Sequence, residues 1–136
     1  MEEVAIYIAI FALFLGTLSI GTTEFVIAGI LPAIAADLSV PIPTAGLLVT
    51  AYAIGVAVGG PILTLLLAPL TRKRAALILM ALFIAGHFIT GLAGDFGWAL
   101  AGRLLSATGH GGYFGVAVVL VATIAPRDRV GTALSF

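Results

Sequence analysis

The stretch AIYIAIFALFLGTLSIGTTEFVIAGI, residues 5–30, decides the fold class of this chain. Nearly all of its side chains are apolar or small, and its single charged residue is Glu24. A helix needs about 20 such residues to cross the hydrocarbon core of a bilayer, and this run is longer. Only a helix or a closed barrel satisfies the backbone in lipid, and the alternation of a barrel strand is absent. The stretch therefore predicts a transmembrane helix.

Three more apolar runs follow, at residues 45–67, 75–92 and 99–124, and another begins near residue 132. Charged residues make up only 9% of the 136-residue chain and hydrophobic residues make up 62%. A soluble domain carries roughly a quarter charged residues, so this composition excludes one. We expect an all-α membrane protein with four transmembrane helices and the start of a fifth. Prolines 32, 41 and 43 are expected to end the first helix and delay the second.

Several classes of function are disfavoured by what the chain lacks. The formal net charge is zero, so nothing marks a surface for nucleic acid. Cysteine is absent, and the two histidines have no companions at metal-ligand spacing. No enzyme motif is found. We therefore expect no catalytic residue, no metal and no cofactor other than protons as a coupling ion. We also expect no cleaved signal peptide, because the amino terminus carries two glutamates and no basic residue.

The positions of the basic residues predict the orientation of the chain in the membrane. Arg72, Lys73 and Arg74 lie between the second and third runs, and Arg127 and Arg129 follow the fourth. The loops on the opposite side carry no basic residue. Cytoplasmic loops are enriched in lysine and arginine, so both basic turns are predicted to be cytoplasmic. The amino terminus is then cytoplasmic as well, in a multi-pass protein of the cytoplasmic (inner) membrane.

Two charged residues, Glu24 and Arg103, lie inside apolar runs. A charge in the membrane interior costs on the order of 3 kcal/mol on insertion scales, so it usually faces a cavity or a partner. Counted from Leu31, Glu24 is about 10 Å deep, and Arg103 is about 6 Å deep from the same side. The two side chains are therefore predicted to lie within reach of each other. They form either a protonation switch or a static buried ion pair, unless Arg103 extends to the outer interface.

Other polar residues in the runs allow two interpretations each. Threonine and tyrosine side chains at a depth similar to that of Glu24 either line a site or bond the helix backbone; these are Thr22, Thr23, Thr50 and Tyr52. His87 is expected to bond a backbone carbonyl as a neutral ring. For His110, which lies among glycines, bonding and proton relay remain equally open.

Small residues at four-residue spacing predict close contact between helices. The pairs are Gly55 with Gly59 and Gly111 with Gly115. We expect these glycines to serve packing rather than ligand binding. Trp98 follows the outer turn and is expected to anchor its helix at the membrane interface.

Three parts of the chain resemble the drug/proton antiporter branch of the major facilitator superfamily, and chloramphenicol-resistance and arabinose-efflux permeases in particular. Residues 21–32 (GTTEFVIAGILP) resemble the first helix of that branch. Residues 44–48 (TAGLL) and 59–61 (GGP) resemble its second helix, and residues 102–115 (GRLLSATGHGGYFG) resemble its fourth. Together the likeness extends over essentially the whole chain.

The resemblance implies a transporter that exports small molecules, such as drugs or sugars, in exchange for protons. Glu24 and Arg103 occupy the positions of the first-helix acid and fourth-helix arginine, which belong to the coupling and substrate region in that family. Residues expected along the substrate pathway are Thr23, Thr50, Tyr52, His110 and Tyr113.

Two parts of the family pattern are altered. The turn between helices two and three normally reads Gly-x-Leu-Ala-Asp-Arg-x-Gly-Arg-Arg, and here residues 64–73 read TLLLAPLTRK. Ala68 replaces the acid, and only the basic tail remains for the cytoplasmic gating turn, at residues 72–74. Ala107 stands where the fourth-helix motif has a glycine.

The length of the chain leaves its assembly open. Transporters of this family have two six-helix halves with the site between them, so we expect the amino-terminal part of such a bundle. Expected partners are the lipid bilayer, a small-molecule substrate, and either the remainder of a transporter or further copies of the chain. Two alternatives stay open: a dimeric four-helix exporter and a non-transporting membrane subunit.

Overall fold

The computed structural model describes residues 2–125 and 130–134, and these residues form helices joined by short turns. The long helices are α1 (Glu2–Asp37), α4 (Arg72–Gly91) and α5 (Phe96–Ile124). Between α1 and α4 lies one continuous helical rod. It consists of α2 (Ile42–Ile54), the π-helical segment η1 (Gly55–Gly59) and α3 (Gly60–Leu66). Short α6 (Val130–Leu134) follows α5, as expected for the start of another span.

Four stretches within the described residues are long and apolar enough to cross a membrane: Val4–Asp37, Ile42–Leu66, Arg72–Gly91 and Phe96–Ile124. They correspond to the four apolar runs of the sequence. The predicted class, an all-α membrane protein with four transmembrane helices, is confirmed. The basic residues at positions 127 and 129 lie outside the described residues.

The first helix is longer than predicted, because Pro32 does not end it. A proline inside a helix removes one ladder hydrogen bond, and membrane helices tolerate this more often than soluble ones. The helix stops at Asp37, where Ser39 adopts a left-handed φ of 53°. The Val40 N–H then donates to the Ala35 carbonyl at 2.9 Å and closes the end of the helix. The depth of Glu24 counted from Leu31 therefore started at the wrong residue.

The second span contains a wide turn that the sequence analysis did not predict. Segment η1 is π-helical, and Pro61 follows it almost directly. Proline has no N–H to donate and its ring crowds the preceding turn, so a widened turn accommodates it. The Gly60 N–H bonds the Gly55 carbonyl, five residues back. The predicted run at residues 45–67 is thus one helical rod with a π-helical interruption.

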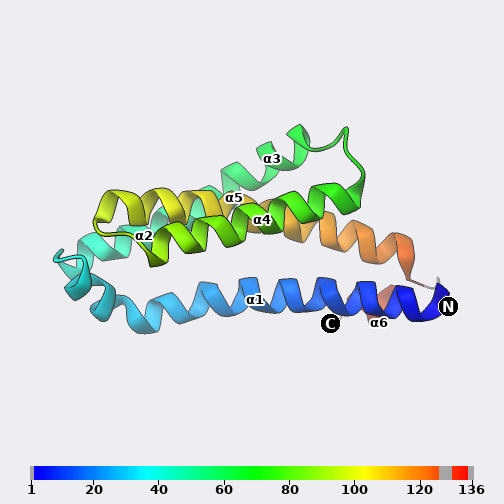
Figure 1. The fold of residues 1–136 in the computed structure, drawn as a ribbon, viewed down its shortest axis with the longest axis horizontal. Coiled ribbons are helices and arrows are strands. Elements are labelled where there is room, and N and C mark those ends of the chain that lie inside the picture. Colours follow the sequence, from blue (N-terminus) through cyan, green and yellow to red (C-terminus); the bar gives the residue numbers. More distant parts are fainter. Residues whose placement is uncertain (1, 126–129, 135–136) are drawn as a thin grey trace.

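Helix α5 forms the centre of the bundle and packs against α4 on one side and against α2, η1 and α3 on another (Figure 1). Glycines permit both contacts. A Cβ at Gly109 would lie 2.6 Å from the Leu79 carbonyl oxygen of α4, and a Cβ at Gly60 would lie 2.6 Å from Cα of Gly111. Real side chains never come that close, so only glycine fits at these two crossings.

The glycine predictions hold at three of the four positions. Gly55, Gly59 and Gly111 lie against α5 or η1, with space for hydrogen alone. Gly115 differs, since a Cβ there would meet no described atom within 4 Å. Its assignment to close helix packing is therefore wrong for the described part of the chain.

Helix α1 lies beside the other helices with much of its surface exposed (Figure 1). It meets the core chiefly through Ile20, which is fully buried. The Tyr113 hydroxyl of α5 also donates to the Leu13 carbonyl at 3.4 Å. The core itself lies between α4, α5 and the middle of α1, and its buried members are Ile20, Ala75, Ala76, Leu79, Phe83, Tyr113, Val116 and Ala117.

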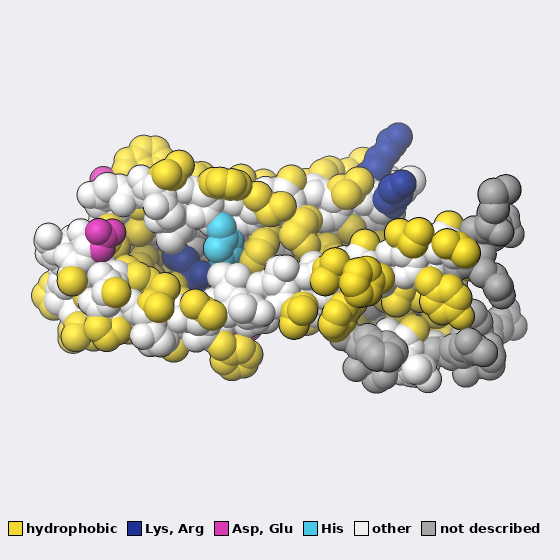
Figure 2. All heavy atoms as spheres, turned by 60° about the horizontal axis from the view of Figure 1, so that its bottom comes forward, with side chains coloured by type: hydrophobic (Ala, Val, Ile, Leu, Met, Phe, Trp, Pro, Cys, Tyr) yellow, Lys and Arg dark blue, Asp and Glu magenta, His cyan; other side chains and the backbone are white. Residues whose placement is uncertain are grey.

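The first turns of α4 and of α5 are each capped by a side chain. Thr71 Oγ1 accepts from the Arg74 N–H at 3.4 Å, and Asp95 Oδ1 accepts from the Trp98 N–H at 3.0 Å. Such caps satisfy amide groups that the first turn of a helix leaves without a partner. Figure 2 shows exposed basic side chains at the end of the molecule where α4 begins, acidic side chains at the opposite end, and a further basic side chain recessed between them.

Candidate functional site

Arg103 is the central residue of the candidate site. It lies on α5, and only 2% of its surface is exposed. Its guanidinium carbon is 3.7 Å from the centre of the Tyr52 ring of α2. A cation over an aromatic face is attracted by the ring, and the attraction is strongest away from water. The alternative that Arg103 extends to the outer interface is therefore wrong.

Tyr52 is itself fixed by a third residue. Its hydroxyl oxygen lies 2.9 Å from Nδ1 of His110, which follows Arg103 on α5 by about two helical turns. His110 in turn contacts the Phe114 ring, with centroids 5.1 Å apart. We call Arg103, Tyr52 and His110 the arginine clamp, because the tyrosine ring supports the guanidinium and the histidine holds the tyrosine. Sequence analysis named all three residues but not their arrangement.

Glu24 lies near the arginine clamp without bonding it. The residue is exposed on α1, and within residues 2–125 and 130–134 its carboxylate forms no ion pair or hydrogen bond. It nevertheless interacts electrostatically with Arg103, Tyr52 and His110. The predicted proximity to Arg103 is thus present as a longer-range interaction. The alternative of a static buried ion pair is not what the structure shows.

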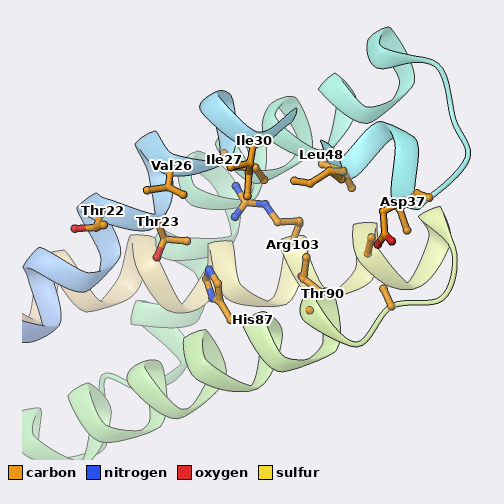
Figure 3. A pocket seen from close by; sticks show the side chains of 15 residues that line it. Thr22, Thr23, Val26, Ile27, Ile30, Asp37, Leu48, His87, Thr90 and Arg103 are labelled. Atoms are coloured by element: carbon orange, nitrogen blue, oxygen red, sulfur yellow. The ribbon is translucent and has the colours of Figure 1, made fainter. Parts of the chain in front are cut away.

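A cavity of about 430 Å³ lies between α1, α4 and α5, with Leu48 of α2 in its wall (Figure 3). Figure 3 shows the Arg103 side chain extending from α5 toward α1, and the His87 and Thr23 side chains approaching each other from opposite sides. The same cavity appears as a hollow that contains a recessed basic side chain beside a histidine (Figure 2). Its volume is within the range of small-molecule sites.

His87 was expected to bond the backbone, and that expectation is confirmed. Its Nδ1–H donates to the Phe83 carbonyl at 2.9 Å, one turn earlier in α4. The structure adds a second property, because the other ring nitrogen of His87, a residue that lines the cavity, is buried and has no hydrogen-bond partner among the described residues. The sequence signal was present in the spacing of His87 and Thr90, which places both polar side chains on one side of the helix.

The threonine hydroxyls bond the backbone of their own helix, which is one of the two interpretations that the sequence allowed. Thr22, Thr23 and Thr50 donate to the carbonyl four residues earlier, at 2.8, 2.9 and 3.5 Å respectively. Thr22 and Thr23 also line the cavity. Thr50 is exposed and does not line it.

Tyr113 is placed in the core rather than in the cavity wall. It is 4% exposed and belongs to the cluster formed by α1, α4 and α5. The basic residues 72–74 are exposed at the start of α4, far along the helix from His87. Roles in a substrate pathway for Tyr113, and in gating for the basic turn, stay predictions.

Apolar helices arranged around a buried arginine, as in this chain, are compared with the sequences of known proteins. The sequence model of the Major Facilitator Superfamily matches residues 13–136. The chain belongs to this superfamily. The resemblance that the sequence indicated is therefore confirmed.

Individual relatives are transporters or resistance proteins. The chain is 41% identical over 124 residues to the inner membrane transport protein YdhP of Escherichia coli K12, covering 91% of this chain and 32% of YdhP. It is 35% identical over 117 residues to the chloramphenicol resistance protein of Streptomyces lividans, covering 86% and 30%. It is 38% identical over 125 residues to a Helicobacter pylori G27 protein whose name describes a sugar efflux transporter, covering 92% and 32%.

The chain spans about a third of the length of these curated relatives. No solved structure matches it. Membership in a superfamily of membrane transporters, with efflux-type relatives, is thus established for the matched residues.

Proposed function

We propose that the protein exports a small molecule across the cytoplasmic membrane in exchange for protons. Glu24 takes up and releases the proton, and the guanidinium of Arg103 in the arginine clamp interacts electrostatically with that carboxylate when it is charged. The observation that carries the proposal is an acid, Glu24, inside the first apolar span and within electrostatic range of a buried arginine beside a cavity. The names of the relatives support efflux as the direction of transport.

The physical basis is the cost of charge in a medium of low dielectric constant. Arg103 stays protonated at any physiological pH, and its guanidinium has no anionic partner within 4 Å in the described part of the chain. A deprotonated Glu24 compensates that charge from a distance, and a protonated Glu24 does not. Protonation therefore changes the field at the cavity wall, which links proton binding to substrate binding at Arg103.

The remaining predicted residues are given roles in the same scheme. We assign Thr23 to the cavity wall, Tyr52 and His110 to the support of Arg103, and Thr50 and Tyr113 to the pathway beyond the cavity. The basic turn at residues 72–74 acts on the cytoplasmic side as a gate, with the amino terminus on that side. Further transmembrane helices, from the same protein or from a second copy, would cover the exposed side of α1.

Transport in proteoliposomes tests the coupling. The protein, expressed from its complete gene, is reconstituted with an imposed pH gradient, and uptake is followed for a panel of labelled small molecules that includes chloramphenicol, arabinose and an apolar molecule with a single carboxyl group. We expect gradient-dependent uptake that Glu24→Gln abolishes, because the amide cannot exchange a proton. Asp95→Asn is the matched control, since asparagine also caps α5 and the residue lies outside the apolar spans. Uptake that is unchanged in Glu24→Gln would exclude the coupling role.

A further inference from the structure

The cavity between α1, α4 and α5 carries an inference about the class of molecule that it binds. Its wall is mostly apolar, with Ile27, Ile30 and Leu48 among the lining residues, and it also contains Arg103 and His87, with Asp37 at the end near the turn after α1. Sites for small molecules combine apolar walls with a few polar groups that fix orientation. A ligand that fits must therefore have an apolar body and a polar group at one end.

Two of the residues that line this cavity each carry a buried nitrogen atom without a hydrogen-bond partner among the described residues. The two atoms are Nε of Arg103 and Nε2 of His87. Arg103 is 98% buried by its exposed fraction of 2%, so water at the surface does not satisfy its Nε–H. Buried polar groups without a partner are rare, because each costs roughly 1–3 kcal/mol. Because both residues line the same cavity, we infer that one bound group forms the missing hydrogen bonds with both nitrogen atoms.

The chemistry of the two nitrogens defines that group. Nε of arginine only donates. Nδ1 of His87 donates to the Phe83 carbonyl, so Nε2 of the neutral ring is an acceptor. The missing group must therefore accept from Arg103 and offer a proton to His87. A carboxyl group does both: one oxygen accepts from Nε–H, and the O–H proton either stays on oxygen and donates, or moves to Nε2 and leaves a carboxylate between two cations.

The charges around the cavity favour an acid with only one carboxyl group. Arg103 supplies a positive charge, which a carboxylate compensates. Asp37 lines the cavity at the end near the turn after α1 (Figure 3), and Glu24 acts electrostatically on Arg103 from its exposed position. A second carboxylate on the ligand would meet one of these acids instead of a cation.

We propose that this cavity binds an apolar molecule bearing a single carboxyl group, and that Arg103 and His87 hold the carboxyl end. The claim that this molecule is also the exported substrate rests on the proposed function. The claim that the cavity binds it does not, because binding needs neither a proton gradient nor transport.

Equilibrium binding with a matched ligand series tests the inference. The protein, expressed from its complete gene, is placed in nanodiscs of neutral lipid and dialysed against labelled 4-phenylbutanoate, with empty nanodiscs as background. We expect saturable binding above that background. Unlabelled 4-phenylbutan-1-ol, 4-phenylbutylamine and heptanedioate should each displace the label at least about tenfold less well than unlabelled 4-phenylbutanoate, since each lacks the single negative carboxyl group.

Variants then locate the binding site. His87→Leu and Arg103→Gln should each weaken binding about tenfold or more, by removing one polar contact. Thr23→Leu should weaken it by filling the cavity, whereas Thr123→Leu should not. Thr123 is a matched control because its hydroxyl also bonds the carbonyl four residues earlier, at 2.7 Å, and it is exposed outside the cavity. Thermal unfolding of each variant shows that the fold is retained.

Three results would overturn the inference: no saturable binding, equal displacement by the alcohol, or unchanged binding in both Arg103→Gln and Thr23→Leu. The ligand series needs no variant, so a misfolded mutant does not obscure the outcome. Failure of the proposed function has a different signature, since Glu24→Gln would then leave transport unchanged while 4-phenylbutanoate still binds at Arg103.

Discussion

At the scale of single residues, the arginine clamp shows how a charge is held inside a helical bundle without an ion pair. The Tyr52 ring faces the guanidinium of Arg103 at 3.7 Å, and the Tyr52 hydroxyl is fixed at 2.9 Å from His110. An acid in direct contact would neutralise the arginine permanently. An aromatic ring supports the cation while leaving its charge available to Glu24 or to a ligand.

Substitution at Tyr52 separates the two interactions of the clamp. Tyr52→Phe keeps the ring and loses the hydroxyl bond, so we expect a loss of about 1 kcal/mol in the free energy of unfolding. Tyr52→Leu also loses the ring beneath Arg103, which should cost about 2 kcal/mol more. Unfolding by denaturant in mixed micelles measures both. Equal stability of the two variants would show that the ring does not hold the guanidinium.

The sequence predicted the residues of the site better than their contacts. Glu24 and Arg103 are recognisable because a charge in an apolar run is costly and therefore rare. The Tyr52 contact with Arg103 is not recognisable, since it depends on how α2 and α5 cross. The unpartnered nitrogen of His87 is equally invisible in sequence, because it depends on the space that α1 leaves open beside α4.

At the scale of helices, the crossing of α5 with the second span depends on a backbone approach that admits no side chain. A Cβ at Gly111 would lie 2.5 Å from the Val56 carbonyl oxygen of η1. The widened turn of η1 brings that carbonyl to the surface of α5. Close packing of small residues is the main source of helix association in lipid, because the hydrophobic effect is weak there.

Alanine at two neighbouring glycines tests this crossing. Gly111→Ala should lower the free energy of unfolding by about 1–3 kcal/mol, since the added methyl group must displace the η1 backbone. Gly115→Ala is the matched control on the same helix, because no described atom lies within 4 Å of a Cβ there. Thermal unfolding in detergent compares them. A destabilisation of equal size in both variants would contradict the assignment.

Helix ends were the least predictable feature at this scale. The four spans follow from hydropathy alone, but α4 and α5 begin at Arg72 and Phe96, three residues before the predicted runs, directly after the caps Thr71 and Asp95. The expectation that proline ends a helix was wrong at Pro32. In a membrane no water competes for the backbone, so the helix keeps its other hydrogen bonds although the one at the proline is missing. The left-handed Ser39 that ends α1 gave no glycine signal.

At the scale of the whole molecule, the distribution of charge predicts the orientation in the membrane. The basic residues Arg72, Lys73 and Arg74 lie at the start of α4, and Asp37 and Asp95 lie at the opposite end of the bundle, at the end of α1 and in the turn after α4. The positive-inside rule predicts that the start of α4 is cytoplasmic. These 136 residues contain no cysteine, so a single cysteine introduced among them is distinct from every other residue of this stretch.

Cysteine labelling in intact cells checks this orientation. Gly94→Cys in the outer turn should react with a membrane-impermeant maleimide added outside the cell, because the position is exposed and a side chain meets nothing there. Lys73→Cys should react only after the membrane is opened. The reverse pattern would place the amino terminus outside and remove the proposed cytoplasmic role of the basic turn.

The central claim is that Glu24 exchanges a proton as the transported molecule moves, and proton movement itself tests it most directly. A pH-sensitive dye is enclosed in proteoliposomes that contain the protein and have no imposed gradient, and the transported molecule is added outside. We predict that the internal pH rises as the molecule enters, because protons leave in exchange, and that Glu24→Gln removes this change while Asp95→Asn keeps it. An equal pH change in Glu24→Gln, or entry of the molecule with no proton movement in the unmodified protein, would contradict the account.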